Sequence, residues 1–363
     1  MIRVLIADDS AAIRGFLRKT LSSDPAIEVV GAATNGVKAV EEYKSLKPDI
    51  VILDIEMPEL NGLGALEQIL KIDSSACVLM CSALTQDNAE TTFKALELGA
   101  MDYIGKPSTT SLFNLPEDFN RSLLEKIHIL SHSRKKPMTT IPINTTNTNT
   151  NIPRSPSILS GPFSLRPMPM LFHKADILAI GSSTGGLQAL FDVLKPLQGR
   201  LTVPVVITQH MPASFTQMLG THIEQKTGIP AHEAKEGDIL VKGQIYVAPG
   251  GKHLEFVRHG DVVTARLSDA PPENFCRPAV DPMFRSLLNV YQRNILAVIL
   301  TGMGSDGLNG ARGLIEASNA NMLIAQDEAS SIVWGMPGAV AKAGLCHAVL
   351  PVSEIGKRIA LYL

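Results

Sequence analysis

The strongest constraint on the fold is a repeated alternation of short apolar runs with amphipathic segments. In the first 130 residues, five apolar runs read IRVLIAD, EVVGAA, DIVILD, CVLMCSA and DYIGK, and segments with helical apolar spacing separate them. Strands that alternate with helices in this way form parallel sheets with right-handed crossovers and helices on both faces. The pattern therefore predicts an α/β domain with a five-stranded parallel sheet.

The alternation resumes in the last 190 residues, where DILAIGSS, VPVVITQH, GQIYVAPG, NILAVILTG and ANMLIAQD are the expected strands. Between the two halves, residues 131–173 are rich in Pro, Thr, Asn and Ser and contain no acidic group. They lack a periodic apolar face, so we predict a flexible linker. The expected organisation is a flavodoxin-like domain over residues 1–130, joined to a second doubly wound α/β domain over residues 174–363.

Composition excludes several classes of protein. The formal net charge is −2 and the pI is about 6.5, and no basic helix-turn-helix pattern occurs, so nucleic acid is not an expected partner. No apolar run reaches the roughly 20 residues that span a bilayer, which argues against membrane insertion. The four cysteines form no C-x-x-C pair, and the first apolar run meets two aspartates too early for a secretory signal. We expect a cytoplasmic protein.

Polar residues follow the predicted strands of the first domain in order. Asp8 and Asp9 end the first strand, Asp54 the third, Ser82 the fourth and Lys106 the fifth. Ligands bind beyond the carboxyl ends of strands in an open parallel sheet, so these groups should converge. Clustered carboxylates repel one another unless a cation lies among them, and oxygen ligands of this kind suit Mg²⁺. The set supports phosphoryl transfer to Asp54, with Lys106 and Ser82 on the phosphoryl oxygens.

The stretch ILAIGSSTGG in the second domain predicts a strand, a tight turn and a helix. Its GSSTG segment fits the G-x-S-x-G pattern of a nucleophilic serine. Three strand ends could supply a catalytic triad, with Ser183 as nucleophile, His210 as base and Asp306 as orienting acid. Ser182 competes with its neighbour for the first role. The order of serine, histidine and acid along the chain differs from that of the α/β-hydrolases, where the acid precedes the histidine, and this difference favours a separate fold.

Backbone amides at Thr184 and Met303 are the candidate oxyanion hole, because glycine-rich turns let the backbone approach a ligand closely. A dinucleotide site is the alternative interpretation of the same turn. It is disfavoured, since GSSTGG lacks the G-x-G-x-x-G spacing and no acidic residue ends the next expected strand.

Four motifs of the first domain, ADDS, LDIEMPELNGL, CSAL and DYIGKP, resemble the receiver domain of two-component response regulators. The resemblance covers residues 1 to about 125. It implies that Asp54 accepts phosphate from a histidine kinase, and that Ser82 and Tyr103 report the phosphorylated state. It also implies a Mg²⁺ site formed by Asp8, Asp9, Asp54 and the backbone of Glu56.

Five motifs of the second domain, IGSSTGG, QHMPASFT, IYVAPGGKHL, RPAVDPMF and LTGMGSDG, resemble the effector domain of the chemotaxis protein-glutamate methylesterase (CheB) family. The resemblance implies the same nucleophile, base and acid, and it offers His253 as a candidate cleft residue. It further implies that glutamyl methyl esters on methyl-accepting chemoreceptors are the substrate, with glutamine deamidation as a second activity.

The tandem arrangement predicts regulation. We expect the unphosphorylated receiver to lie over the catalytic cleft and phosphorylated Asp54 to favour an open arrangement. The competing hypothesis is a receiver-controlled docking module whose serine site is inert.

Overall fold

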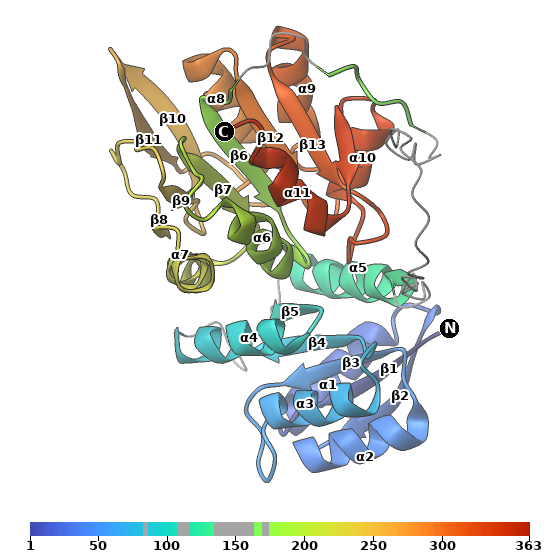
Figure 1. Ribbon diagram of the computed structural model, residues 1–363. Helices are drawn as coiled ribbons and strands as arrows, with labels where there is room; N and C mark the ends of the chain where they lie inside the picture. Colours follow the sequence, from blue (N-terminus) through green and yellow to red (C-terminus); the bar gives the residue numbers. More distant parts are fainter. Residues whose placement is uncertain (83–85, 107–116, 134–162, 169–173) are drawn as a thin grey trace, which may run out of the picture.

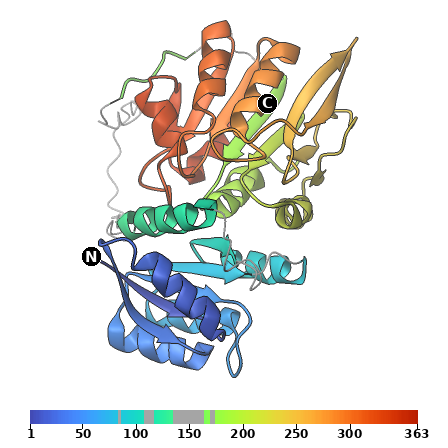
Figure 2. The same cartoon turned by 180° about the vertical axis from the view of Figure 1, so that it is seen from behind.

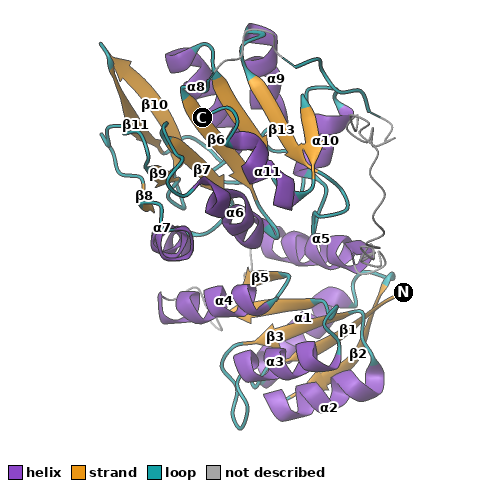
Figure 3. Cartoon of the chain, viewed as in Figure 1, coloured by secondary structure: helices purple, strands orange, loops and turns teal. Residues whose placement is uncertain are grey.

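The computed structural model describes residues 1–82, 86–106, 117–133, 163–168 and 174–363. These residues form two α/β domains, and Figure 1 shows one above the other with the N-terminal domain below. In each domain helices cover both faces of a central sheet (Figure 3). None of the helices described in these ranges has the length and apolar character to cross a membrane.

The N-terminal domain has the predicted five-stranded parallel sheet, with strand order β2-β1-β3-β4-β5. Each predicted strand is confirmed: β1 (Ile2–Ala7), β2 (Ile27–Ala33), β3 (Ile50–Asp54), β4 (Val78–Ser82) and β5 (Asp102–Gly105). The helices are α1 (Ala11–Leu21), α2 (Gly36–Leu46), α3 (Gly62–Ile72), α4 (Gln86–Leu98) and α5 (Glu117–Ser133).

The C-terminal domain has a seven-stranded sheet in the order β14-β13-β12-β6-β7-β9-β8, and all its paired strands are parallel. The five predicted strands correspond to β6 (Ile177–Ser182), β7 (Val205–Gln209), β9 (Ile245–Val247), β12 (Ile295–Ile299) and β13 (Met322–Gln326). The sequence interpretation missed β8 (Ala231–Glu233), β14 (Ala348–Leu350) and an antiparallel hairpin of β10 (His253–His259) and β11 (Val262–Ser268).

Helices cover this second sheet on both faces, which explains why its central strands are continuous apolar runs. All residues of β6, β7, β12 and β13 are buried. The α-helices are α6 (Gly186–Leu194), α7 (Ala213–Thr227), α8 (Val280–Tyr291), α9 (Leu308–Ala317), α10 (Met336–Lys342) and α11 (Val352–Ile359).

The chain enters the sheet at β6 and builds outward in both directions, so the strand order reverses between β6 and β12. In open α/β sheets such a reversal point opens a crevice beyond the carboxyl ends of the strands. The turn from β6 into α6 lies there, and Gly185 takes a left-handed φ of 75° in it. The predicted strand, tight turn and helix are therefore present at the edge where a ligand would bind.

The two domains pack through α4 and β5 on one side and α6 and α7 on the other. The ring of Tyr103 stacks on Phe215 with centroids 4.6 Å apart and planes at 10°. Phe93 of α4 lies 5.8 Å from the same Phe215 ring, and Glu97 forms an ion pair with Lys226 at 3.0 Å. Figure 2, the view from behind, shows α4 and α5 at this boundary.

The predicted linker lies largely outside the described residues, and its described ends differ from the expectation. Helix α5 continues to Ser133, past the predicted start at residue 131. At the other end, the N–H of Arg166 donates to the carbonyl of Cys346 at 2.8 Å, and the rings of Phe163 and Trp334 are 5.9 Å apart. Residues 163–168 are thus in contact with the C-terminal domain.

Gly62 offers a test of packing beside the candidate phosphoacceptor. A Cβ at Gly62 would overlap the backbone carbonyl of Asp54, which cannot rotate away. We expect Gly62→Ala to lower the free energy of unfolding by roughly 1–3 kcal/mol. Gly15→Ala in α1 is the matched control, because nothing lies within 4 Å of a Cβ there, and it should stabilise by up to about 1 kcal/mol. Urea unfolding followed by circular dichroism measures both, and equal effects would contradict the prediction.

Candidate active site and phosphoacceptor site

The acidic groups of the N-terminal domain meet at the carboxyl ends of β1 and β3, as predicted. Asp8 and Asp54 are buried whereas Asp9 is exposed, and oxygens of the three carboxylates lie within 4.8 Å of one another. The ammonium of Lys106 is 2.8 Å from Asp8 Oδ2 and 2.5 Å from Asp54 Oδ2. One ammonium against three carboxylates leaves excess negative charge, and an all-oxygen donor set of this kind fits Mg²⁺.

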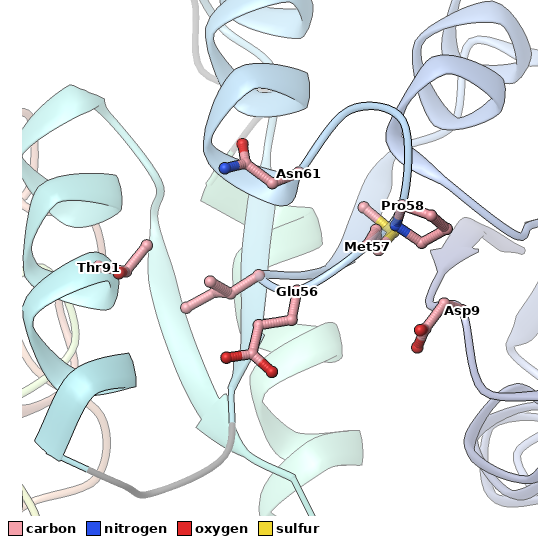
Figure 4. Close-up of a pocket in the computed structure, with 7 residues that line it drawn as sticks. Asp9, Glu56, Met57, Pro58, Asn61 and Thr91 are labelled. Atoms are coloured by element: carbon pink, nitrogen blue, oxygen red, sulfur yellow. The ribbon is translucent and has the colours of Figure 1, made fainter.

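Burial raises the pKa of Asp54 to about 6, although Lys106 opposes the shift. A cation at this edge would stabilise the ionised form that a nucleophilic carboxylate needs. The N–H of Glu56 lies 3.4 Å from Asp54 Oδ1. Figure 4 shows Glu56 and Asp9 in one pocket, with Thr91 of α4 on its other side.

The two predicted switch residues occupy different positions. Ser82 is fully buried at the end of β4, and its carbonyl accepts the N–H of Lys106 at 2.7 Å. Tyr103 lies on β5 with its ring against Phe215 of the other domain. The residue expected to report phosphorylation is therefore part of the domain interface.

The two neighbouring serines of the β6–α6 turn differ in accessibility. Ser182 is fully buried, and its hydroxyl donates to Gln209 Oε1 at 2.5 Å. Ser183 is half-buried, and its backbone is fixed by N–H donation to Thr301 at 3.0 Å and by acceptance from Gln209 Nε2 at 2.8 Å. Ser182 thus has a structural hydrogen bond, and Ser183 is the accessible hydroxyl of the pair.

His210 and Asp306 lie next to each other, with Nε2 2.7 Å from the carboxylate Oδ2. Asp306 also accepts backbone N–H groups of Val280 at 2.6 Å, Asp281 at 3.1 Å and Gly307 at 2.9 Å. Burial alone would raise the pKa of Asp306, but the histidine and these amides outweigh it, so the pKa is lowered. The acid is therefore a carboxylate held in one orientation against the ring.

The other ring nitrogen of His210 contacts a residue that the sequence interpretation did not single out. Cys276 Sγ lies 3.4 Å from His210 Nδ1. Burial opposes protonation of the ring, but Cys276 and Asp306 together raise the pKa of His210. Within the described residues, Ser183 makes no hydrogen bond to His210. The structure thus brings the three predicted groups to one edge without joining the serine to the base.

The candidate oxyanion donors flank Ser183 on separate loops. Neither the N–H of Thr184 nor that of Met303 donates a hydrogen bond to any residue in the described ranges. The side chain of Thr184 is engaged, because its hydroxyl donates to Asp102 Oδ2 on β5 at 2.7 Å.

His253 is not placed in an open cleft. It is fully buried, with Nε2 3.1 Å from the carbonyl of Pro271 and Nδ1 accepting the N–H of Ala279 at 3.2 Å. The expectation of a cleft residue is corrected, since both ring nitrogens serve to fix the loop that precedes α8.

The receiver domain covers the serine edge of the second sheet. A cavity of only 20 Å³ remains between the domains, about the space of one water molecule. Its lining includes Tyr103 from one domain and Ser183 from the other. On this side, the space beside the serine is therefore too small for a bulky substrate.

The remaining contributors were invisible to sequence reasoning because they act through tertiary contacts. Asn274 donates to Asp306 Oδ1 at 3.0 Å and to Asp281 Oδ2 at 3.1 Å. In the sequence, Asp102 is one strand residue among others, and its hydrogen bond with Thr184 depends on the packing of the two domains. For Cys276, the only signal was its position just before the RPAVDPMF motif.

Comparisons with known proteins identify the families of the two domains. Residues 4–114 match the response regulator receiver domain and residues 178–359 the CheB methylesterase domain. A protein-glutamate methylesterase/protein-glutamine glutaminase of the group 2 operon from Rhodospirillum centenum is 45% identical over 98% of this chain and 92% of its own. One from Rhodopseudomonas palustris is 43% identical over 99% of this chain and 93% of its own.

Among solved structures, the CheB methylesterase catalytic domain of Thermotoga maritima is 33% identical, with a TM-score of 0.50. It covers 52% of this chain and 100% of its own length. The chain, with a receiver domain ahead of a catalytic domain of this kind, belongs to the CheB methylesterase family.

Proposed function

We propose that the chain hydrolyses glutamyl methyl esters on methyl-accepting chemoreceptors in the cytoplasm, and also deamidates glutamine side chains there. The observation that carries the proposal is the His210–Asp306 pair, with the acid buried, at the sheet edge that presents Ser183. The names of relatives that match nearly the whole chain support the same reaction.

In the proposed mechanism, Ser183 attacks the ester carbonyl and His210 takes its proton. The ring then protonates methanol as it leaves. In the second half of the reaction, water attacks the acyl-enzyme, His210 takes a proton from the water, and the ring returns a proton to Ser183 as the glutamate is released. Asp306 holds the ring and stabilises its protonated form. The geometry supports this division of roles, because a carboxylate that accepts hydrogen bonds from five groups is fixed in place and remains charged.

The N–H groups of Thr184 and Met303 stabilise the oxyanion that forms during attack. An amide carbon can be attacked in the same position as an ester carbon, with ammonia in place of methanol as the leaving group. Glutamine deamidation therefore needs no further residue.

In the receiver domain, Asp54 attacks the phosphoryl group supplied by a histidine kinase, and Lys106 binds the transferred phosphoryl oxygens. Mg²⁺, when bound, neutralises charge on the phosphoryl oxygens. Asp8, Asp9 and Asp54 are the side chains that would bind it, with the backbone of Glu56 as the proposed fourth contributor.

Phosphorylation regulates access to Ser183 in this proposal. The interface contains Tyr103, and the hydroxyl of Thr184 is bonded to Asp102, so rearrangement of β5 acts directly on the residue next to the nucleophile. A shift of about 2 kcal/mol toward the open arrangement would raise activity roughly thirtyfold.

One prediction from the proposed function distinguishes the two serines. Ser183→Ala should lower kcat for methanol release by roughly 10³-fold or more, because the nucleophile is lost. Ser182→Ala is the matched control: it removes the hydrogen bond to Gln209, costs about 1–3 kcal/mol of stability and retains measurable turnover. Both are assayed on methylated receptor fragments with a small-molecule phosphodonor and Mg²⁺. If Ser183→Ala turns over substrate while a folded Ser182→Ala does not, Ser182 is the nucleophile. If the wild-type protein itself shows no turnover, a docking role is favoured.

Another prediction concerns the domain interface. Lys226→Glu places two acids opposite each other at the ion pair with Glu97, and Glu97→Lys places two ammonium groups there. Each single variant should raise the unphosphorylated activity roughly twofold to fivefold by weakening the closed arrangement. The double variant restores the ion pair and should return to the wild-type value.

Lys357→Glu on α11, away from the interface, is the control for a change of charge alone. Asp54→Asn should keep the basal rate and lose the response to the phosphodonor. Single interface variants that leave the basal rate unchanged, or a double variant as active as the singles, would contradict regulation through this contact.

A further inference from the structure

Cys276 lies at the end of a tight turn whose backbone is fixed by hydrogen bonds. Glu273 and Cys276 exchange backbone hydrogen bonds of 3.1 and 2.9 Å. The two residues between them, Asn274 and Phe275, have left-handed φ values of 51° and 62°, which is the conformation of a two-residue type I′ turn. The side-chain amide of Asn274 bonds Asp306. The same acid therefore fixes both the turn and the histidine ring.

This turn places the thiol at the nitrogen that catalysis requires. His210 Nε2 is occupied by Asp306 at 2.7 Å, and Nδ1 lies 3.4 Å from Cys276 Sγ. A histidine base oriented by an acid on one nitrogen must accept the nucleophile's proton on the other. In this arrangement the thiol, and not the hydroxyl of Ser183, lies at that nitrogen.

We propose that Cys276 is a positioning residue that holds Nδ1 of His210 in the closed state, so that the ring must leave the thiol before it can accept the proton of Ser183. The inference rests on the proposed function, in which Ser183 is the nucleophile and His210 the base. The closed state would therefore restrain the site in two ways: the receiver covers Ser183, and Cys276 holds His210.

The protons balance without a further reactant. In the closed state one proton is shared between Sγ and Nδ1. When the ring is released, that proton remains on the thiol, and Nδ1 accepts the proton of Ser183 as the carbon–oxygen bond forms. The same proton then passes to the departing methanol. Cys276 ends as it began, and no oxidant or reductant takes part.

The receiver domain contacts the turn directly. The guanidinium of Arg121 on α5 lies 4.2 Å from the centroid of the Phe275 ring, next to the thiol in sequence. Separation of the domains would remove this contact and leave the turn free to shift. The restraint on His210 is thereby linked to the same rearrangement that uncovers Ser183.

The proposal has a pH signature. Burial opposes protonation of the ring, but Cys276 and Asp306 outweigh it and raise the pKa of His210. A base acts in its deprotonated form, so kcat/KM rises with pH through this pKa. Removal of the thiol lowers the pKa and moves the rise to lower pH. The other charged groups around this corner are Asp281, the ion pair of Glu273 with Arg285, and Arg121.

The test is the pH profile of the basal kcat/KM for methanol release by the full-length protein without phosphodonor, the condition in which the closed state persists. We expect the rising limb of the Cys276→Ala profile to lie at least one pH unit below that of the wild type. At a fixed pH on this limb, kcat/KM of the variant should then be about tenfold higher than that of the wild type. Cys276→Ser should shift in the same direction, because a hydroxyl is a much weaker acid than a thiol and shares its proton with the ring less readily. Cys346→Ala, which removes a buried thiol elsewhere, is the control and should leave the limb in place.

A merely structural role for Cys276 would lower the plateau or the melting temperature and leave the limb unmoved, and that result would overturn the proposal. Activity in Ser183→Ala in the same assay would instead overturn the proposed function. A second measurement does not depend on turnover: ¹⁵N-histidine NMR of the unphosphorylated protein, with the resonances of His210 identified by their loss in His210→Gln. The pKa of His210 should be lower in Cys276→Ala than in the wild type, and an equal pKa would again refute the proposal.

Discussion

Both sites depend on one constraint, that parallel strands end at a common edge of their sheet. In the first sheet this constraint brings Asp8 and Asp54 together from β1 and β3, although 45 residues separate them. In the second it brings Ser183, His210 and Asp306 together from the ends of β6, β7 and β12. The apolar interiors of these strands supply the burial that makes each polar group at the edge interact strongly with its neighbours.

The serine edge of the second sheet faces the receiver domain, and this orientation puts the receiver in contact with residues around the catalytic serine. Tyr103 stacks on Phe215, and Asp102 accepts the hydroxyl of Thr184 beside the nucleophile. A change at the phosphoacceptor can therefore reach the catalytic serine through one strand of the first domain. The contact of Cys276 with His210 places a second restraint at the same edge.

The sequence predicted the fold class, the ten principal strands and the acids, serine and histidine at their ends, because parallel α/β sheets have a strong apolar pattern and a fixed ligand edge. It did not predict β8 and β14, which have only three residues each, or the hairpin of β10 and β11. The contact of Cys276 with His210 and the burial of His253 depend on how loops fold back over the sheet, and local sequence carries little information about that. Ser182 and Ser183 could be distinguished only by burial.

The central claim is that the receiver covers the serine edge until Asp54 is phosphorylated. Hydrogen–deuterium exchange of the full-length protein, with and without beryllofluoride and Mg²⁺ as a phosphoryl mimic, tests it most directly. The account predicts faster exchange in α4, in α7 and in the turn after β6 when the mimic is present, with β12 and β13 unchanged. Unchanged exchange at these interface segments, in a sample whose methylesterase activity has risen, would contradict it.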